Sequence, residues 1–252
     1  MNVEVRSPAD PAAGTLTLAI DIGGTGLKGA VLDPSGVPLS DRLRVPTPED
    51  RRPEKVVDAL AALADQLGHF DRVSVGFPGV IRRGIVLTAP HLGTDDWRDF
   101  PLAKTLSERL NAPVRILNDA SVQGYGVISG HGVECAITLG TGVGFALYEN
   151  GVLGPHMELG RYPVHKNTLL DDYLGRVAFQ KISRKHWNRR VQRVLSYLET
   201  LVNYDVLYIG GGNAKHIKLD LPDNVRIVPN EAGVTGGIKL WQPEVDYAFA
   251  ET

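Results

Sequence analysis

Short apolar runs alternate along the first half of the chain with segments whose apolar residues recur every three or four positions. The runs predict strands at 16–20, 29–33, 37–45, 72–75 and 114–117, with a small hairpin at 81–87. Helical spacing at 54–67 and 102–110 places two helices between the later strands. Three strands followed by helix, strand, helix and strand is an order typical of an α/β domain.

The second half of the chain opens as the first half does. Strands are predicted at 134–139, 143–148, 204–209 and 225–228. A helical region is predicted at 168–202, and a final helix from about 232. The first two strands of each half enclose a Gly-Thr-Gly turn, at residues 24–26 and again at 140–142. We therefore expect two similar α/β domains that face each other across a cleft.

The predicted boundaries place one domain at 14–119 and the other at 120–252. Residues 1–13, which are rich in proline and charge, predict a flexible tail. The last helix, from about residue 232, is in a position to pack back on the first domain.

The composition of the chain argues against several classes of function. The chain has 252 residues and a net charge of −2, which argues against bulk binding of nucleic acid. Its single cysteine, Cys135, excludes an internal disulfide and a cysteine-cluster zinc site. Since no apolar run reaches membrane-spanning length and the N-terminus lacks the pattern of a signal peptide, we expect a cytoplasmic protein without membrane partners.

The first glycine-rich turn predicts a phosphate site. Gly23 and Gly24 let the backbone approach a ligand closely, and N–H groups in such a turn form an anion-binding concavity. Thr25 adds a hydroxyl and Lys28 a positive charge, while Asp21, before the turn, is a candidate ligand for a metal ion.

Other interpretations of this turn remain open. Gly24, Gly26 and Gly29 also fit the dinucleotide-binding pattern, but that pattern needs a helix to follow, and the next residues are β-like. The P-loop pattern fails because no Ser or Thr follows a Gly-Lys pair. A glycine-rich hairpin without a ligand also fits.

Three further segments carry candidate binding residues. Asn118 and Asp119 end an apolar strand, where α/β sheets place ligands, and Asp119 could act as a general base; capping of the following helix is the alternative. Glu158 and Arg161 could bind sugar hydroxyls, or form an ion pair in a surface turn. The run from Gly210 to Gly212 suits contact with a nucleotide, or a plain turn.

Taken together, these motifs resemble the ROK family of sugar kinases, and within it the polyphosphate glucokinase branch. The resemblance runs from residue 15 to about 240, through AIDIGGTGLKGAVLD, GFPGVIRRGIV, ILNDASVQGYG, ITLGTGVGFAL, MELGR, LYIGGGNAK and NEAGVTGG. It implies the actin-like, ribonuclease-H-like fold of two domains with a cleft, usually as a homodimer. It also implies transfer of a phosphoryl group from polyphosphate or ATP to a hydroxyl of glucose or a related hexose, with Mg²⁺ and without zinc.

The resemblance assigns roles residue by residue. It implies that Asp119 is the catalytic base and that Asn118, Glu158 and Gly79 lie at the sugar. The implied phosphate-binding and nucleotide-binding residues are Asp21, Gly23, Gly24, Thr25, Lys28, Gly140, Thr141, Gly142, Gly210, Gly211 and Gly212, with Asp21 holding Mg²⁺ through water.

Two sugar-contact positions depart from the family pattern. Arg161 stands where the family usually has His, and His91 stands where it has Asn. These departures favour a sugar other than glucose, or a sugar-responsive binding or regulatory protein with weak catalysis. The retained Asp119 and Lys28 favour an enzyme.

A basic segment, 181–193, suggests how a long donor could bind. On a helix, Lys185, Arg189 and Arg193 would form a ridge opposite an apolar face that contains Trp187 and Val191. A solvated helix surface is the alternative to a track for a polyanion.

Overall fold

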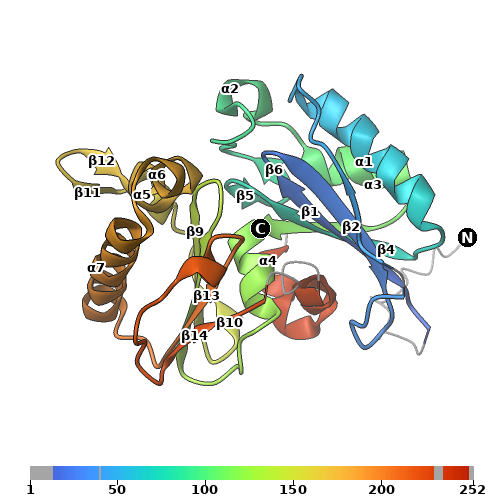
Figure 1. Cartoon of the computed structure of the whole chain (residues 1–252). Coiled ribbons are helices and arrows are strands. Elements are labelled where there is room, and N and C mark those ends of the chain that lie inside the picture. The colour runs from blue at the N-terminus through green and yellow to red at the C-terminus, as the bar shows by residue number, and fades with distance from the viewer. Residues whose placement is uncertain (1–13, 40, 230–234, 250–252) are drawn as a thin grey trace, which may run out of the picture.

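The computed structural model describes residues 14–39, 41–229 and 235–249 (Figure 1). The first sheet contains β1 (Thr17–Gly23), β2 (Gly26–Leu32), β3 (Leu43–Val45), β4 (Arg72–Phe77) and β7 (Val114–Asn118). The second contains β8 (Val133–Leu139), β9 (Val143–Glu149), β10 (Val152–Leu153), β13 (Val206–Gly210) and β14 (Val225–Ile227).

The two sheets have the same topology. Their strand orders are β3-β2-β1-β4-β7 and β10-β9-β8-β13-β14. In each sheet the first strand pairs antiparallel with the second and parallel with a later strand. The repeat predicted from the two Gly-Thr-Gly turns is therefore a repeat of topology, and it brings both turns to corresponding ends of the sheets.

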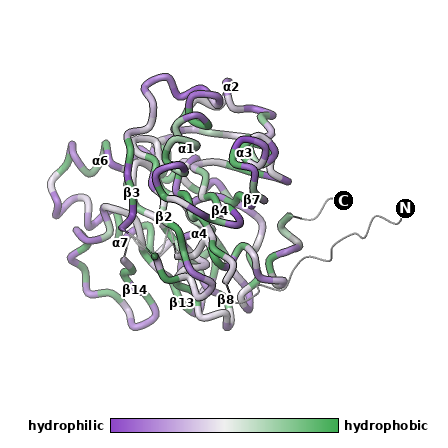
Figure 2. The backbone as a smooth tube through the Cα atoms, turned by 90° about the vertical axis from the view of Figure 1, so that its right-hand side faces the viewer, coloured by the Kyte–Doolittle hydropathy of each residue, from purple (hydrophilic) through white to green (hydrophobic). Residues whose placement is uncertain are grey.

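Helices α1 (Pro53–Leu67) and α3 (Leu102–Leu110) cover the outer face of the first sheet (Figure 1). The predicted spacing of α1 is confirmed, because Val56, Leu60 and Leu63 are buried in the first core. In Figure 2 the strands carry mostly hydrophobic positions, whereas the peripheral segments are mostly hydrophilic. Near this sheet lie the small hairpin of β5 (Ile81–Arg82) and β6 (Ile85–Val86) and the short α2 (Thr94–Trp97).

The second sheet is covered by α5 (Leu170–Leu174), α6 (Arg176–Lys181) and α7 (Arg184–Val202). The predicted helical region at 168–202 is therefore not continuous. Its first residues form β12 (Thr168–Leu169), which pairs with β11 (Pro163–His165). Gly175 ends α5, and the side chain of Ser183 caps α7, so the chain changes direction between the helices.

Helix α4 (Asp119–Tyr125) lies between the two sheets and contacts β4, β8 and β9 (Figure 1). The predicted helix start near Ala232 lies outside the described residues. The described segment after it forms two short 3-10 helices, η3 (Gly236–Trp241) and η4 (Pro243–Ala248). The Ser74 hydroxyl donates to the carbonyl of Gly237 at 2.7 Å, which holds η3 against the first sheet.

Two other predictions differ in extent. The third strand, predicted at 37–45, is limited to β3 and one bridge between Leu32 and Pro38. Pro38 has no N–H to donate to a longer ladder. None of the helices in the described parts of the chain combines the length and apolar character needed to cross a membrane.

Candidate active site

Two adjoining cavities lie between the sheets, with volumes of about 110 and 370 Å³. They share the residues Gly23, Gly24, Asp119, Thr138, Gly140 and Thr141. Both Gly-Thr-Gly turns and the first residue of α4 therefore meet at one place. The side chain of Asp119 lies where the two cavities join.

The surroundings of Asp119 raise its pKa from 3.8 to about 7. Burial is the largest cause, because it disfavours the charged carboxylate, and the negative charges of Asp21 and Glu158 act in the same direction. The N–H of Ala120 donates to one carboxylate oxygen at 2.8 Å and partly offsets this shift. A carboxylate with a pKa near neutrality is suited to accept a proton from a hydroxyl group.

Asn118 has a structural role beside its place in the smaller cavity. Its side-chain oxygen accepts from the N–H of Ala120 at 2.9 Å and caps α4, as one of the two sequence interpretations held. Its amide nitrogen donates to the carbonyl of Gly79 at 3.1 Å. Asn118 therefore fixes both the start of α4 and the loop that carries Gly79.

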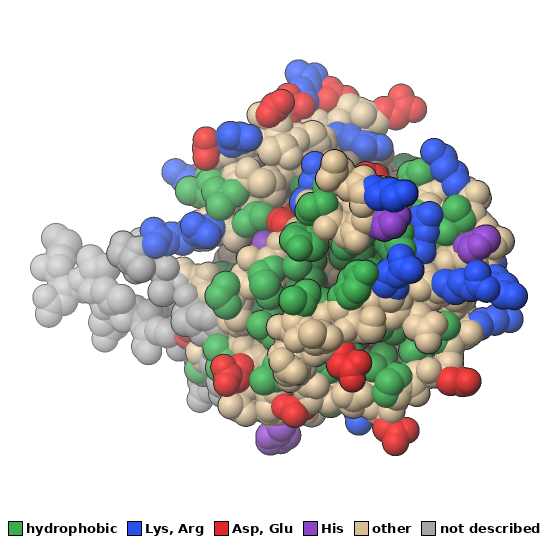
Figure 3. All heavy atoms as spheres, turned by 90° about the vertical axis from the view of Figure 1, so that its left-hand side faces the viewer, with side chains coloured by type: hydrophobic (Ala, Val, Ile, Leu, Met, Phe, Trp, Pro, Cys, Tyr) green, Lys and Arg blue, Asp and Glu red, His purple; other side chains and the backbone are tan. Residues whose placement is uncertain are grey.

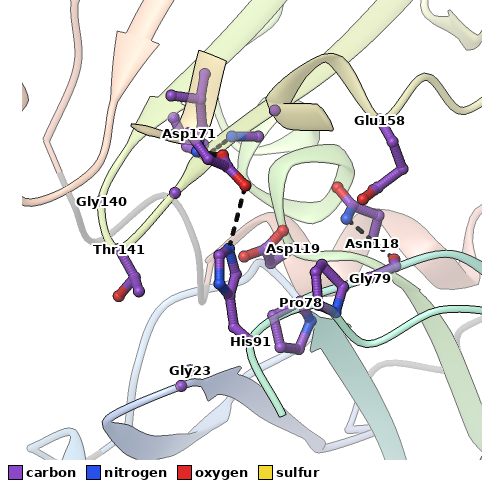
Figure 4. Close-up of a pocket in the computed structure, with 17 residues that line it drawn as sticks. Gly23, Pro78, Gly79, His91, Asn118, Asp119, Gly140, Thr141, Glu158 and Asp171 are labelled. Atoms are coloured by element: carbon purple, nitrogen blue, oxygen red, sulfur yellow. Dashed lines mark hydrogen bonds and ion pairs between the residues drawn. The ribbon is translucent and has the colours of Figure 1, made fainter. Parts of the chain in front are cut away.

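The smaller cavity is lined by acidic and amide groups as well as backbone (Figure 4). His91, from the first half of the chain, lies with its Nε2 3.8 Å from a carboxylate oxygen of Asp171, from the second half. The N–H of Val143 donates to Asp171 at 2.7 Å, and His156 holds Glu158 at 2.6 Å. A Cβ at Gly142 would come within 2.5 Å of the Nε2 of His91 and 2.6 Å of a carboxylate oxygen of Asp171, so a larger residue there would displace both side chains.

Arg161 lies apart from these groups. It ends η1 (Leu159–Arg161), its side chain is exposed, and it does not line either cavity. Its positive charge nevertheless lowers the pKa of Asp171, which burial raises. A direct contact between Arg161 and a sugar remains a prediction.

The larger cavity is rich in positive charge. Asp21, Lys28 and Arg44 are cross-strand partners on β1, β2 and β3, so their side chains lie in a row on one face. The ammonium of Lys28 is 2.5 Å from a carboxylate oxygen of Asp21. The guanidinium of Arg44 lies over Gly26, where a Cβ would approach its Nε to 2.8 Å.

Other residues of this cavity come from distant parts of the chain. They are Thr25, Arg42, Gln123, Arg176, Gly211, Gly212 and Asn213. Gly210 does not line it; its backbone packs against the side chain of Gln123. Gln123 is 7% exposed, and its Nε2 is buried without a hydrogen-bond partner among the residues that the structure describes.

The sequence prediction missed Asp171, Gln123 and the three arginines Arg42, Arg44 and Arg176. Gln123 could have been found, because residues four apart share a helix face and Asp119 begins the same helix. Arg44 could have been found only with the register of β3. No local sequence pattern marks Asp171 or Arg176 as a site residue, because the tertiary fold of the second half brings them to the cavities.

Phosphoryl transfer generally uses a divalent metal ion. The described residues contain no group of three or more His, Cys, Asp or Glu side chains that could enclose a metal. Asp21 lines the larger cavity. Its carboxylate fits Mg²⁺, which keeps several waters and takes one or two carboxylates together with phosphate oxygens.

The sequence profile of the ROK family matches residues 17–169. A polyphosphate glucokinase from Mycobacterium leprae is 31% identical over 91% of this chain and 77% of its own length. The inorganic polyphosphate/ATP-glucomannokinase of Arthrobacter sp. strain KM has a TM-score of 0.82 and 32% identity, over 90% of this chain and 98% of its own. A ROK family glucokinase from Streptomyces griseus, in complex with glucose and AMPPNP, shares the fold with a TM-score of 0.77 and 22% identity, covering 89% and 98% of the two chains.

The fold and the cleft define the class as a carbohydrate kinase with the actin-like, two-domain ATPase fold. The chain belongs to the ROK family. The predicted family, fold class and type of enzyme are thereby confirmed.

Proposed function

We propose that the protein transfers a phosphoryl group from polyphosphate or ATP to a hydroxyl group of glucose or a related hexose. One observation carries the proposal: the Asp119 carboxylate lies where a cavity lined by acids and amides meets a cavity lined by cations. Sugar hydroxyls suit the first lining, and a phosphate chain suits the second.

In this proposal the sugar occupies the smaller cavity, where Glu158, Asp171 and His91 can bind its hydroxyl groups. Asp119 accepts the proton of the reacting hydroxyl as its oxygen bonds to the terminal phosphorus of the donor. The bond from that phosphorus to the rest of the donor breaks, and the shortened donor keeps the electron pair. The two Gly-Thr-Gly turns hold the transferring group from both sides.

The donor occupies the larger cavity. Lys28, Arg44 and Arg176 offset the negative charge of the phosphates, which is the main contribution that a protein makes to phosphoryl transfer. Mg²⁺ bound through Asp21 would supply further charge compensation. A homodimer remains a prediction from the family resemblance.

The proposal is tested by incubating the purified protein with a panel of hexoses and with ATP or polyphosphate, and by measuring phosphorylated sugar. Product formed with at least one pair supports it. Sugar binding without product from any donor would favour the alternative, a sugar-responsive binding or regulatory protein. The presence of Asp119, of Lys28 and of both Gly-Thr-Gly turns favours an enzyme over a binding protein.

Asp171 should be a determinant of sugar affinity. We expect Asp171→Ala to raise the KM for the sugar about tenfold to a hundredfold, because a hydrogen bond to a charged group contributes about 1.5–3 kcal/mol. The KM for the donor should change less than twofold in steady-state assays. As a control, Asp172→Ala removes the neighbouring carboxylate, which lies outside both cavities. Equal changes in both KM values for Asp171→Ala would place this residue outside the sugar site.

Gln123 should contact the donor. Its buried Nε2 has no partner within the described part of the chain, and a phosphate oxygen in the cavity that Gln123 lines would satisfy it. We expect Gln123→Leu to raise the KM for the donor about threefold to tenfold, as the loss of one hydrogen bond of about 1 kcal/mol implies. Stability toward urea should stay the same or increase, since an unsatisfied polar group is removed. An unchanged donor KM in a folded variant would rule out this contact.

A further inference from the structure

A separate cavity of about 620 Å³ lies outside the cleft, between α7 and the segment that follows β13. Arg184, Lys185 and Arg189 line it from α7, and His216 and Lys218 line it from the opposite side. None of the described residues that line it is acidic. Figure 3 views the molecule from the side of α7 and shows Lys and Arg side chains gathered along one side of this face.

Hydrogen bonds fix the two walls of this cavity relative to each other. Asn188 is 7% exposed, and its amide nitrogen donates to the carbonyls of Arg184 at 2.9 Å and His216 at 3.2 Å. The side-chain oxygen of Asn188 accepts from the N–H of Lys218 at 2.7 Å. The guanidinium of Arg184 also lies over the ring of Phe179, 3.3 Å from its centroid. The basic groups are therefore held on a rigid frame.

The charge of this cavity is not neutralised. Within the described parts of the chain, Lys185, Arg189 and Lys218 form no ion pair, whereas exposed cations elsewhere do, such as Lys104 with Glu108 and Arg109 with Asp58. Several like charges facing one hollow repel each other and attract an anion, and a concave wall strengthens that field. A ligand with many negative charges would relieve the repulsion.

Some residues that line this cavity follow closely, along the chain, residues that line the donor side of the cleft. Gly212 and Asn213 line the larger cavity of the cleft, and His216, at the end of η2 (Ala214–His216), lines the basic cavity. Helix α6 starts in the cleft with Arg176, and α7 follows it directly. A flexible anionic chain with its reacting end in the cleft would meet cationic groups on both sides of η2.

We propose that this cavity is an exosite that binds the distal part of a linear polyphosphate chain while the chain's terminal phosphate lies at Asp119. The proposal rests on the proposed function, because it takes a phosphate chain as the donor. Arg193 of the predicted ridge is not part of the exosite; it does not line the cavity, and its guanidinium is 3.4 Å from the hydroxyl of Tyr173.

The test compares the full-length protein with a variant that carries Lys185→Gln, Arg189→Gln and Lys218→Gln. Binding of fluorescently labelled long-chain polyphosphate is followed by anisotropy over a range of NaCl concentrations. Affinity at low salt should fall about tenfold or more, and the slope of log K against log salt should lose about 2, at about 0.7 per lost contact. Binding of tripolyphosphate and the KM for ATP should change less than twofold.

The matched control carries Lys55→Gln, Lys104→Gln and Arg109→Gln on α1 and α3, which lie on the other side of the molecule (Figure 1). It has the same change of net charge and should bind long chains as the parent protein does. Equal losses in both triple variants would overturn the exosite, because they would reflect net charge alone. An equal loss for tripolyphosphate or ATP would also overturn it, because the cavity would then belong to the donor site itself.

The exosite and the proposed function can fail separately. If no sugar is phosphorylated with any donor, but the variant of Lys185, Arg189 and Lys218 still loses long-chain affinity, the kinase proposal fails and the binding of a polyphosphate chain in this cavity stands. If ATP supports turnover and long-chain polyphosphate does not bind to the parent protein, the exosite fails and the kinase proposal stands.

Discussion

Asp119→Asn is expected to lower the turnover number about a hundredfold to ten-thousandfold, the usual contribution of general-base catalysis. The amide has the shape of the carboxyl group but cannot accept the proton of the sugar hydroxyl. The KM values for sugar and donor should change far less, because Asn118, Glu158 and the two Gly-Thr-Gly turns remain in place. Initial rates of sugar phosphate formation at pH 8 measure this effect.

Stability provides the control for this substitution. Burial raises the pKa of Asp119, so the ionised carboxylate, which predominates at pH 8, destabilises the folded protein relative to the unfolded chain. Removing the charge should leave the urea midpoint at pH 8 unchanged or raise it. A variant that folds normally and keeps more than about half of the parent's turnover would exclude Asp119 as the base.

The second large effect concerns pH. Because Asp119 acts as a base only when it is ionised, and its pKa is about 7, kcat/KM should fall tenfold for each pH unit below that value. About one hundredth of the plateau activity should remain at pH 5. Above about pH 8 the carboxylate is almost fully ionised, and the profile should reach a plateau. Rates measured with a donor whose own ionisation is known separate the two contributions.

Substitution of Glu158 tests whether the acidic limb of the pH profile reports the ionisation of Asp119. The negative charge of Glu158 raises the pKa of Asp119, so Glu158→Gln should move the acidic limb to lower pH, whatever it does to the plateau. Arg161→Gln, which changes an exposed charge outside both cavities, should leave the limb in place. A limb at pH 5 or below in the parent protein would contradict the raised pKa of Asp119, and a limb that Glu158→Gln leaves in place would belong to another group.

Much of this molecule follows from short-range patterns in its sequence. The helical spacing of Val56, Leu60 and Leu63 is enough to define the buried face of α1, and Asn118 caps α4 through a contact two residues away. The two Gly-Thr-Gly turns predict two hairpins because glycine permits the tight turn. Local patterns failed between 168 and 202, where Gly175 and the pairing of β11 with β12 break the helical region.

Sequence alone determined the repeated α/β halves, the family and the two Gly-Thr-Gly turns, since each depends on motifs that are contiguous along the chain. The tertiary structure alone decided which distant groups complete the cavities. His91 faces Asp171 and Gln123 faces the donor side because two sheets pack around α4, and no local preference specifies those contacts. The raised pKa of Asp119 has the same origin, because it arises mainly from burial, which exists only once the sheets enclose the carboxyl group.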